Sequence, residues 1–129
     1  MEENQIVGKR LLLVEDDRAV REMLKTALSI NACTVVEANN GAEGLGLFRN
    51  GRFDLVMVDL EMPFIKGDEL ARSIKQLEPR QPILMLTGHD TKPSLKNPVD
   101  ALLHKPVVLT RLREVMAGLL AETETRVAA

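Results

Sequence analysis

The chain has few residues of the types that usually mark redox and cofactor sites. Among its 129 residues it has no tryptophan, no tyrosine, three phenylalanines and one cysteine. A single cysteine, Cys33, excludes an internal disulfide and leaves no second thiol for a metal site, so we interpret it as a small, partly buried apolar residue. The scarcity of aromatic rings disfavours flavin binding, because flavin sites surround the ring system with aromatic side chains.

A strong excess of either charge is also missing. Seventeen Lys and Arg against nineteen Asp and Glu leave a net charge of −2, and the sequence has no long basic run. Such a run would attract phosphate backbones or anionic lipid. We therefore expect no direct binding to nucleic acid and no binding to membranes.

Long apolar segments are missing as well. No apolar stretch approaches the roughly 20 residues that cross a bilayer, and the acidic start from Met1 to Asn4 lacks the pattern of a secretory signal. The expected location is the cytoplasm. An apolar share of 45% suits one hydrophobic core, and no repeat or linker is present. We expect one domain over residues 8–122, with short tails at residues 1–7 and 123–129.

Five short apolar runs have few polar interruptions, as strands covered on both faces should have. They predict strands at Lys9–Val14, Thr34–Glu37, Asp54–Val58, Pro82–Leu86 and Ala101–His104. Between them, apolar residues recur at steps of three and four, which is typical of helices that pack one face on a sheet. The predicted helices are Ala19–Leu28, Ala42–Arg49, Asp68–Leu77 and Leu109–Leu120. A fourth helix in chain order should lie in Thr91–Pro98, where Pro93 and Pro98 predict a short or distorted turn.

Polar residues follow three of the predicted strands. Glu15 and Asp16 end one run, Asp59 ends another, and Lys105 follows the last. Because ligands bind at the carboxyl ends of strands in an α/β sheet, we expect these side chains to converge. The pattern indicates a nucleophilic carboxylate, an acidic metal site and a lysine in one place.

Four segments resemble, in type and order, the receiver domain of two-component response regulators in the CheY-like superfamily. They are Leu11–Asp17, Asp54–Pro63 with Gly67 behind it, Met85–Gly88 and His104–Pro106. The resemblance runs from about Arg10 to Leu120. It implies an α/β fold of the flavodoxin-like, three-layer (βα)5 type, with a five-stranded parallel sheet in the order 2-1-3-4-5.

The resemblance also implies a role for each polar residue. Asp59 is the implied phosphoryl acceptor, Thr87 a hydroxyl donor that moves toward the phosphoryl group, and Lys105 the cationic partner, with a cis peptide before Pro106. The implied cofactor is Mg²⁺. Its implied ligands are the carboxylates of Asp16 and Asp59, Glu15 through water, and the backbone carbonyl of Glu61.

Elementary electrostatics agrees with this site. A carboxylate is a poor nucleophile unless the charge of the phosphoryl group that it attacks is neutralised. Mg²⁺ prefers oxygen ligands and usually keeps several waters. Carboxylates about 4 Å apart repel by roughly 4 kcal/mol at an effective dielectric constant near 20, and a divalent cation relieves this. Without metal, one of the acids should bind a proton more readily. Asp17 is expected outside the site, as an acid in the first turn of a helix.

The chain departs from the family pattern at several positions. Leu102 stands where receivers usually carry an aromatic that rotates behind the moving Thr, so that switch is in doubt. The stretch from Thr87 to Lys105 is about one helical turn short, which predicts an altered partner surface. Phe64 is expected either in the core or as a contact for a kinase. Glu61 and His89 should flank the phosphoryl group and affect attack by water.

We therefore expect a stand-alone receiver. It would accept a phosphoryl group from a phosphohistidine on a sensor kinase or phosphotransfer protein, and signal to a downstream protein by altered contact, with a homodimer left open. We expect no turnover enzyme. A degenerate receiver that docks without phosphorylation and a receiver fragment of a hybrid histidine kinase are alternatives.

Two further alternatives come from other classes of protein. Haloacid-dehalogenase-like phosphatases also use a strand-end Asp, but they place it on the first strand and carry a second Asp two residues on, where this chain has Glu61. Flavodoxin-like proteins need a Ser/Thr- and Gly-rich loop after the first strand, where this chain has acids. The sequence does not identify the kinase, the target or the process controlled.

Overall fold

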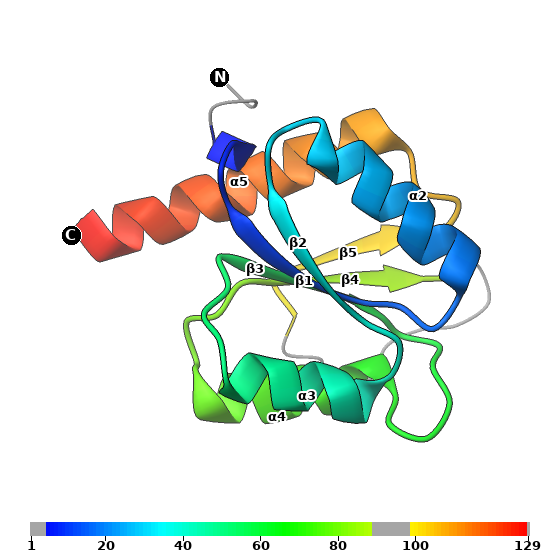
Figure 1. Cartoon of the computed structure of the whole chain (residues 1–129). Helices are drawn as coiled ribbons and strands as arrows, with labels where there is room; N and C mark the ends of the chain where they lie inside the picture. Colours follow the sequence, from blue (N-terminus) through cyan, green and yellow to red (C-terminus); the bar gives the residue numbers. More distant parts are fainter. Residues whose placement is uncertain (1–4, 89–98, 129) are drawn as a thin grey trace.

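A central parallel sheet organises the protein. The computed structural model describes residues 5–88 and 99–128, with side chains up to residue 122. In this part of the chain five strands pair in the order β2-β1-β3-β4-β5, as the sequence predicts (Figure 1). The strands are β1 at Arg10–Val14, β2 at Thr34–Ala38, β3 at Leu55–Asp59, β4 at Ile83–Thr87 and β5 at Ala101–His104.

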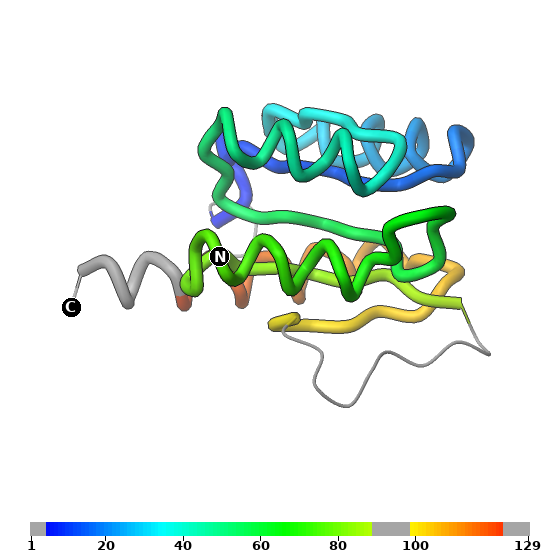
Figure 2. The backbone as a smooth tube through the Cα atoms, turned by 90° about the horizontal axis from the view of Figure 1, so that it is seen from below, coloured from blue at the N-terminus to red at the C-terminus, as the bar shows by residue number. Residues whose placement is uncertain are grey.

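Four helices of the described residues cover the sheet. Helices α2 (Arg18–Ser29) and α5 (Leu109–Ala128) lie on one face, and α3 (Gly41–Arg49) and α4 (Gly67–Leu77) on the other (Figure 1). Figure 2 shows α3 and α4 side by side on their face. The predicted helix in Thr91–Pro98 lies outside the described residues, and so do the predictions for Pro93, Pro98 and His89. No helix of the described residues has both the length and the apolar character that crossing a membrane requires.

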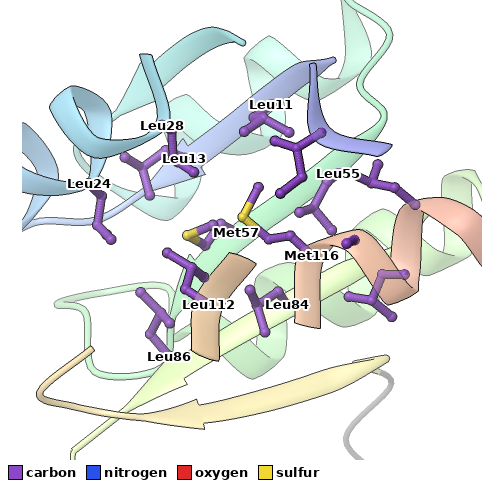
Figure 3. Packing of buried hydrophobic residues seen from close by; sticks show 14 residues of the cluster. Leu11, Leu13, Leu24, Leu28, Leu55, Met57, Leu84, Leu86, Leu112 and Met116 are labelled. Atoms are coloured by element: carbon purple, nitrogen blue, oxygen red, sulfur yellow. The ribbon is translucent and has the colours of Figure 1, made fainter. Parts of the chain in front are cut away.

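The strands alternate the direction of their side chains, which divides the core into two clusters. Leu11 and Leu13 of β1 face α2 and α5, whereas Leu12 and Val14 face α3 and α4. Figure 3 shows the first cluster, in which α2 and α5 direct leucine and methionine side chains onto the sheet. Its labelled members are Leu11, Leu13, Leu24, Leu28, Leu55, Met57, Leu84, Leu86, Leu112 and Met116. Burial on both faces explains why the strands appear in the sequence as nearly unbroken apolar runs.

Side-chain caps fix where two of the helices begin. The Asp17 carboxylate accepts hydrogen bonds from the backbone N–H groups of Ala19 and Val20, at 2.9 and 3.2 Å, so Asp17 is the N-cap of α2. Asn40 caps α3 by accepting a 2.8 Å hydrogen bond from the N–H of Glu43. These caps orient the loops that follow β1 and β2.

Several boundaries differ from the sequence-based prediction. Ile6, which we expected in a tail, is fully buried in the cluster under α2 and α5. Helix α5 continues to Ala128, through residues expected as a tail. Strands β3 and β4 each end one residue later than expected, at Asp59 and Thr87.

Candidate functional site

The carboxyl ends of four strands meet at one edge of the sheet and carry the predicted polar residues. Asp59 and Thr87 are the last residues of β3 and β4, while Glu15 and Lys105 directly follow β1 and β5. The parallel register places Asp59 beside Leu86 and Thr87 beside His104. Because these strand pairs fix the backbone at the last residue of each strand, they also fix the positions from which the Asp59 and Thr87 side chains extend.

Lys105 joins the acids of two strands. Its ammonium nitrogen Nζ donates to Asp59 Oδ2 at 3.1 Å and lies 3.0 Å from Glu15 Oε1. The backbone N–H of Lys105 donates to the carbonyl of Thr87 at 2.7 Å, which continues the ladder past β5. The Lys105–Pro106 peptide is cis, as expected. The lysine predicted to pair with Asp59 therefore does so, and it contacts Glu15 as well.

Three carboxylates gather around this lysine. Glu15, Asp16 and Asp59 each bring an oxygen within 4.8 Å of the others. Glu15 is fully buried and Asp59 is 2% exposed, whereas Asp16 lies open to solvent. Asp17, the neighbouring acid, turns to cap α2 instead, as its exclusion from the site predicted. The result is an acidic cluster with one exposed side.

The charge states of the cluster follow from its burial. Desolvation raises the pKa of Glu15 to about 8, the nearby Asp59 adds to the rise, and Lys105 opposes it. Burial by itself lowers the pKa of Lys105, but its contacts with Glu15 and Asp59 outweigh this and raise the pKa above its ordinary value. The higher pKa means that Glu15 binds a proton more readily than an exposed glutamate does, and desolvation contributes more to this rise than the repulsion expected from the sequence.

The donor set fits a magnesium ion. Carboxylate oxygens are the hard ligands that Mg²⁺ prefers, and the exposed Asp16 leaves a side through which water can complete an octahedral shell. Burial raises the pKa of Glu15, and a divalent cation beside it would stabilise the charged form of this carboxylate. The backbone carbonyl of Glu61 stays a predicted ligand.

Glu61 has a contact that the sequence did not reveal. Its side-chain oxygen Oε1 accepts a 3.1 Å hydrogen bond from the hydroxyl of Thr87 and a 2.7 Å hydrogen bond from the backbone N–H of Gly88. Its own backbone N–H donates to Asp59 Oδ1 at 3.2 Å. The spacing from Asp59 indicated that Glu61 flanks the site, but no sequence pattern fixes the direction of a loop side chain.

Gly67 lies directly behind Asp59. A Cβ atom at Gly67 would lie 2.2 Å from the backbone carbonyl oxygen of Asp59 and 2.7 Å from the Cα of Leu60. No side chain fits at such distances, so the first residue of α4 must be glycine for the helix to approach the end of β3. The glycine thereby fixes the backbone that presents the Asp59 carboxylate.

Two departures from the family pattern have clear positions. The Phe64 side chain is 96% exposed, and its backbone has a φ of 68°, so the expectation that it packs in the core is wrong. Leu102 is half-buried on β5, where it pairs with Met85 and packs against the cluster under α3 and α4. Leu102 fills space beside β4 without a ring or a hydroxyl.

Comparison with known proteins agrees with this geometry. The family model of the response regulator receiver domain matches residues 11–117. A curated relative, the response regulator MprA of Mycobacterium sp. (strain KMS), is 40% identical over 118 residues, which cover 88% of this chain and 51% of the relative. The chain thus spans about half the length of the curated relatives it matches.

Solved structures give the same result. A CheY-like receiver domain protein from Methanospirillum hungatei is 32% identical, with a TM-score of 0.85 over 92% of this chain and 98% of that one. The response regulator TrrA from Thermotoga maritima, solved in complex with Mg²⁺ and a beryllium fluoride, is 34% identical, with a TM-score of 0.81 over 86% of this chain and 98% of that one.

Proposed function

The chain belongs to the response regulator receiver family, and on that premise we propose that it accepts a phosphoryl group on Asp59 from a phosphohistidine. The donor would be a sensor histidine kinase or a histidine phosphotransfer protein. Mg²⁺ would be the cofactor. The family also separates the chain from the phosphatase and flavodoxin-like alternatives that share parts of its pattern.

One observation supports the proposal most strongly. The buried Asp59 carboxylate lies 3.1 Å from the Lys105 ammonium and brings an oxygen within 4.8 Å of carboxylate oxygens of Glu15 and Asp16. A nucleophilic carboxylate needs cationic groups beside it, because the phosphoryl group that it attacks is itself negative. Lysine and an acid cluster suited to a divalent cation supply that environment.

The transfer is a single displacement at phosphorus. An Asp59 carboxylate oxygen forms the new O–P bond while the N–P bond to the donor imidazole breaks, and the imidazole nitrogen keeps the electron pair and takes a proton from solvent. Lys105 then exchanges its contact with the free carboxylate for one with a phosphoryl oxygen. Asp16, Asp59 and the Glu61 carbonyl would hold Mg²⁺ directly and Glu15 through water, and the bound ion would supply positive charge beside the phosphoryl oxygens.

The output is proposed to be a change in protein contact. A phosphoryl group on Asp59 adds charge and hydrogen-bond acceptors at the ends of β3 and β4, which can shift an equilibrium between two arrangements of the neighbouring loops. The described residues form one receiver unit that acts without turnover of a free substrate. We propose that it works in the cytoplasm, where a downstream protein reads its surface, and that homodimerisation is one form this output can take.

Phe64 is proposed as a contact for the phosphodonor. Its ring is 96% exposed and follows the β3 end by five positions, so it lies in the loop nearest to the acceptor. A donor histidine must come within bonding distance of Asp59, and its protein therefore covers this loop. An exposed aromatic at such a rim provides apolar contact area to that partner.

Labelling with acetyl phosphate and Mg²⁺ tests the proposed function directly. Intact-mass measurement should show one phosphoryl adduct on the parent protein, and none on Asp59→Asn or in the presence of EDTA. The adduct should disappear with time, as an acyl phosphate hydrolyses. A parent protein that takes no adduct under these conditions contradicts the proposal and favours a dock that works without phosphorylation.

A further inference from the structure

Glu61 connects the loop after β3 to the end of β4. The single oxygen Oε1 accepts from the Thr87 hydroxyl at 3.1 Å and from the Gly88 N–H at 2.7 Å. Thr87 is fully buried, and Glu61 is partly exposed. A short hydrogen bond from a backbone amide to a carboxylate is of the strong, charge-assisted kind. Glu61 therefore holds both the side chain and the backbone at the β4 end.

The absence of a side chain at Gly88 permits this contact. A Cβ atom at Gly88 would lie 3.1 Å from Glu61 Oε1, which is closer than ordinary van der Waals contact, and 3.4 Å from Oε2. With glycine at this position, the carboxylate reaches the backbone N–H without displacement. Thr87 thus offers a hydroxyl, and Gly88 an unobstructed backbone N–H, to the acid at position 61.

Thr87 can satisfy only one acceptor with its hydroxyl hydrogen. In the described structure its near acceptors are Glu61 Oε1 at 3.1 Å and the Gly88 carbonyl at 3.4 Å. A threonine that donates to a phosphoryl oxygen on Asp59 must give up Glu61. The two contacts therefore compete for the same proton.

We propose that Glu61 is a positioning residue whose side chain latches Thr87 and Gly88 in the unphosphorylated protein and sets how readily a phosphoryl group captures Thr87. The inference rests on the proposed function of Asp59. It assigns the Glu61 side chain a role separate from that of the Glu61 carbonyl.

Phosphorylation would act on the latch from the backbone side as well. The Glu61 N–H donates to Asp59 Oδ1 at 3.2 Å, so the loop that carries the carboxylate begins at the modified group itself. A phosphoryl group on Asp59 places like charge beside the Glu61 carboxylate and weakens its hold on the β4 end. Competition for the Thr87 hydroxyl and repulsion of the Glu61 carboxylate both weaken the hold of Glu61 on the β4 end.

The latch also gives Thr87 a restraint that does not depend on an aromatic residue of β5. Leu102 offers neither a ring to rotate nor a hydroxyl to donate. Glu61 restrains the same threonine from the loop after β3, through a hydrogen bond rather than packing. Its release would free the Thr87-Gly88 end of β4 to change position.

The experiment compares Glu61→Gln with Glu61→Ala. Both variants remove the charge, but glutamine keeps an oxygen that can accept from Thr87 and Gly88, whereas alanine removes the acceptor. Amide hydrogen exchange of Gly88 in the unmodified protein should be about tenfold faster in Glu61→Ala and within about threefold of the parent in Glu61→Gln. Half-saturation with beryllium fluoride and Mg²⁺, followed by NMR, should need about fivefold less ligand for Glu61→Ala than for Glu61→Gln.

The outcomes separate the latch from the proposed function. Unchanged exchange of the Gly88 amide in Glu61→Ala overturns the latch, and so does equal beryllium fluoride binding by the two variants, which would show that charge alone matters. A parent protein that binds no beryllium fluoride and takes no phosphoryl group overturns the function of Asp59 and with it the release step. In that case protection of the Gly88 amide still reports whether Glu61 holds the β4 end.

Discussion

The Lys105 ammonium lies 3.0 Å from Glu15 Oε1, yet the pKa of this buried carboxyl group is raised to about 8. Desolvation is the largest cause, the nearby Asp59 adds to it, and the attraction of Lys105 only offsets part of the rise. The lysine must serve two carboxylates at once, so neither pair is neutralised fully. The site therefore stores negative charge at the cost of stability, which leads to a prediction about pH.

Glu15→Gln should stabilise the metal-free protein at alkaline pH. The pKa of Glu15 rises from 4.5 in the unfolded chain to about 8 in the folded one, so the folded state binds the proton more tightly. Its contribution to stability is fully present below pH 4.5 and is lost as the pH rises through about 8. Because one pKa unit corresponds to about 1.4 kcal/mol, glutamine should raise the free energy of unfolding by at least that amount at pH 9.

Urea unfolding without divalent ions at several pH values checks this prediction. The gain from glutamine should be close to zero near pH 4, grow with pH, and level off above the folded-state pKa. A gain of the same size at every pH would mean that glutamine packs better and that ionisation of Glu15 is not involved. Saturating Mg²⁺ should shrink the gain, because the ion stabilises the charged carboxylate of the parent protein.

Asp16 and Asp17 are neighbours with separate tasks, which gives a matched test of the metal site. Asp16 belongs to the acid cluster, whereas the Asp17 carboxylate caps α2. Asp16→Asn should weaken Mg²⁺ binding about tenfold or more, since a charged ligand is lost. Asp17→Asn should change it less than about twofold, because asparagine caps a helix as well as aspartate does. Isothermal titration with Mg²⁺ suits a protein that has no tryptophan, and equal losses in the two variants would count against the assigned cluster.

Gly67 and Gly46 should respond in opposite ways to alanine. A Cβ at Gly67 would collide with the backbone of Asp59 and Leu60, so Gly67→Ala should cost roughly 2 kcal/mol or more of stability and slow labelling by acetyl phosphate. Gly46 lies inside α3 with nothing within 4 Å of its Cβ position. Gly46→Ala should therefore stabilise the protein by about 0.5–1 kcal/mol. Chemical unfolding of both variants decides the matter, and a neutral Gly67→Ala would show that the loop can move away.

The fold could be predicted from the sequence because burial on both faces leaves a strong pattern. The apolar runs gave all five strands, and the apolar steps gave the helices α2 to α5. The ends were less accurate where the deciding contact is distant in the chain. Pairing of Thr87 with His104 lengthens β4, and packing against both α5 and the sheet buries Ile6, although nothing near either residue in the sequence signals it.

The site residues, too, include some that could be predicted from the sequence and some that could not. Convergence of Glu15, Asp59 and Lys105 follows from topology alone, because parallel strands end at one edge of the sheet. The contact between Glu61 and Thr87 could not be predicted, since it depends on the direction of a side chain in an irregular loop. The sequence pattern thus predicts contacts that depend on strand order. It does not predict contacts that depend on the conformation of a loop.

Phe64 provides the last prediction, because its backbone and its side chain both carry a cost. Its φ of 68° lies in the left-handed region, and its ring is 96% exposed, so the protein gains almost no packing from it. Phe64→Gly should raise the free energy of unfolding by up to about 1 kcal/mol. Ala32→Gly, at a φ of 57°, should act similarly, whereas Ile30→Gly should destabilise, because Ile30 is also exposed but has an ordinary helical φ of −59°.

Thermal and urea unfolding of the three glycine variants give the comparison. If Phe64→Gly is the more stable protein and still takes a phosphoryl group from acetyl phosphate, the ring serves neither the fold nor the chemistry. A large aromatic that the isolated protein would be more stable without is then best explained by a partner that covers it. Loss of stability in Phe64→Gly, to the extent seen for Ile30→Gly, would remove this argument for a docking role.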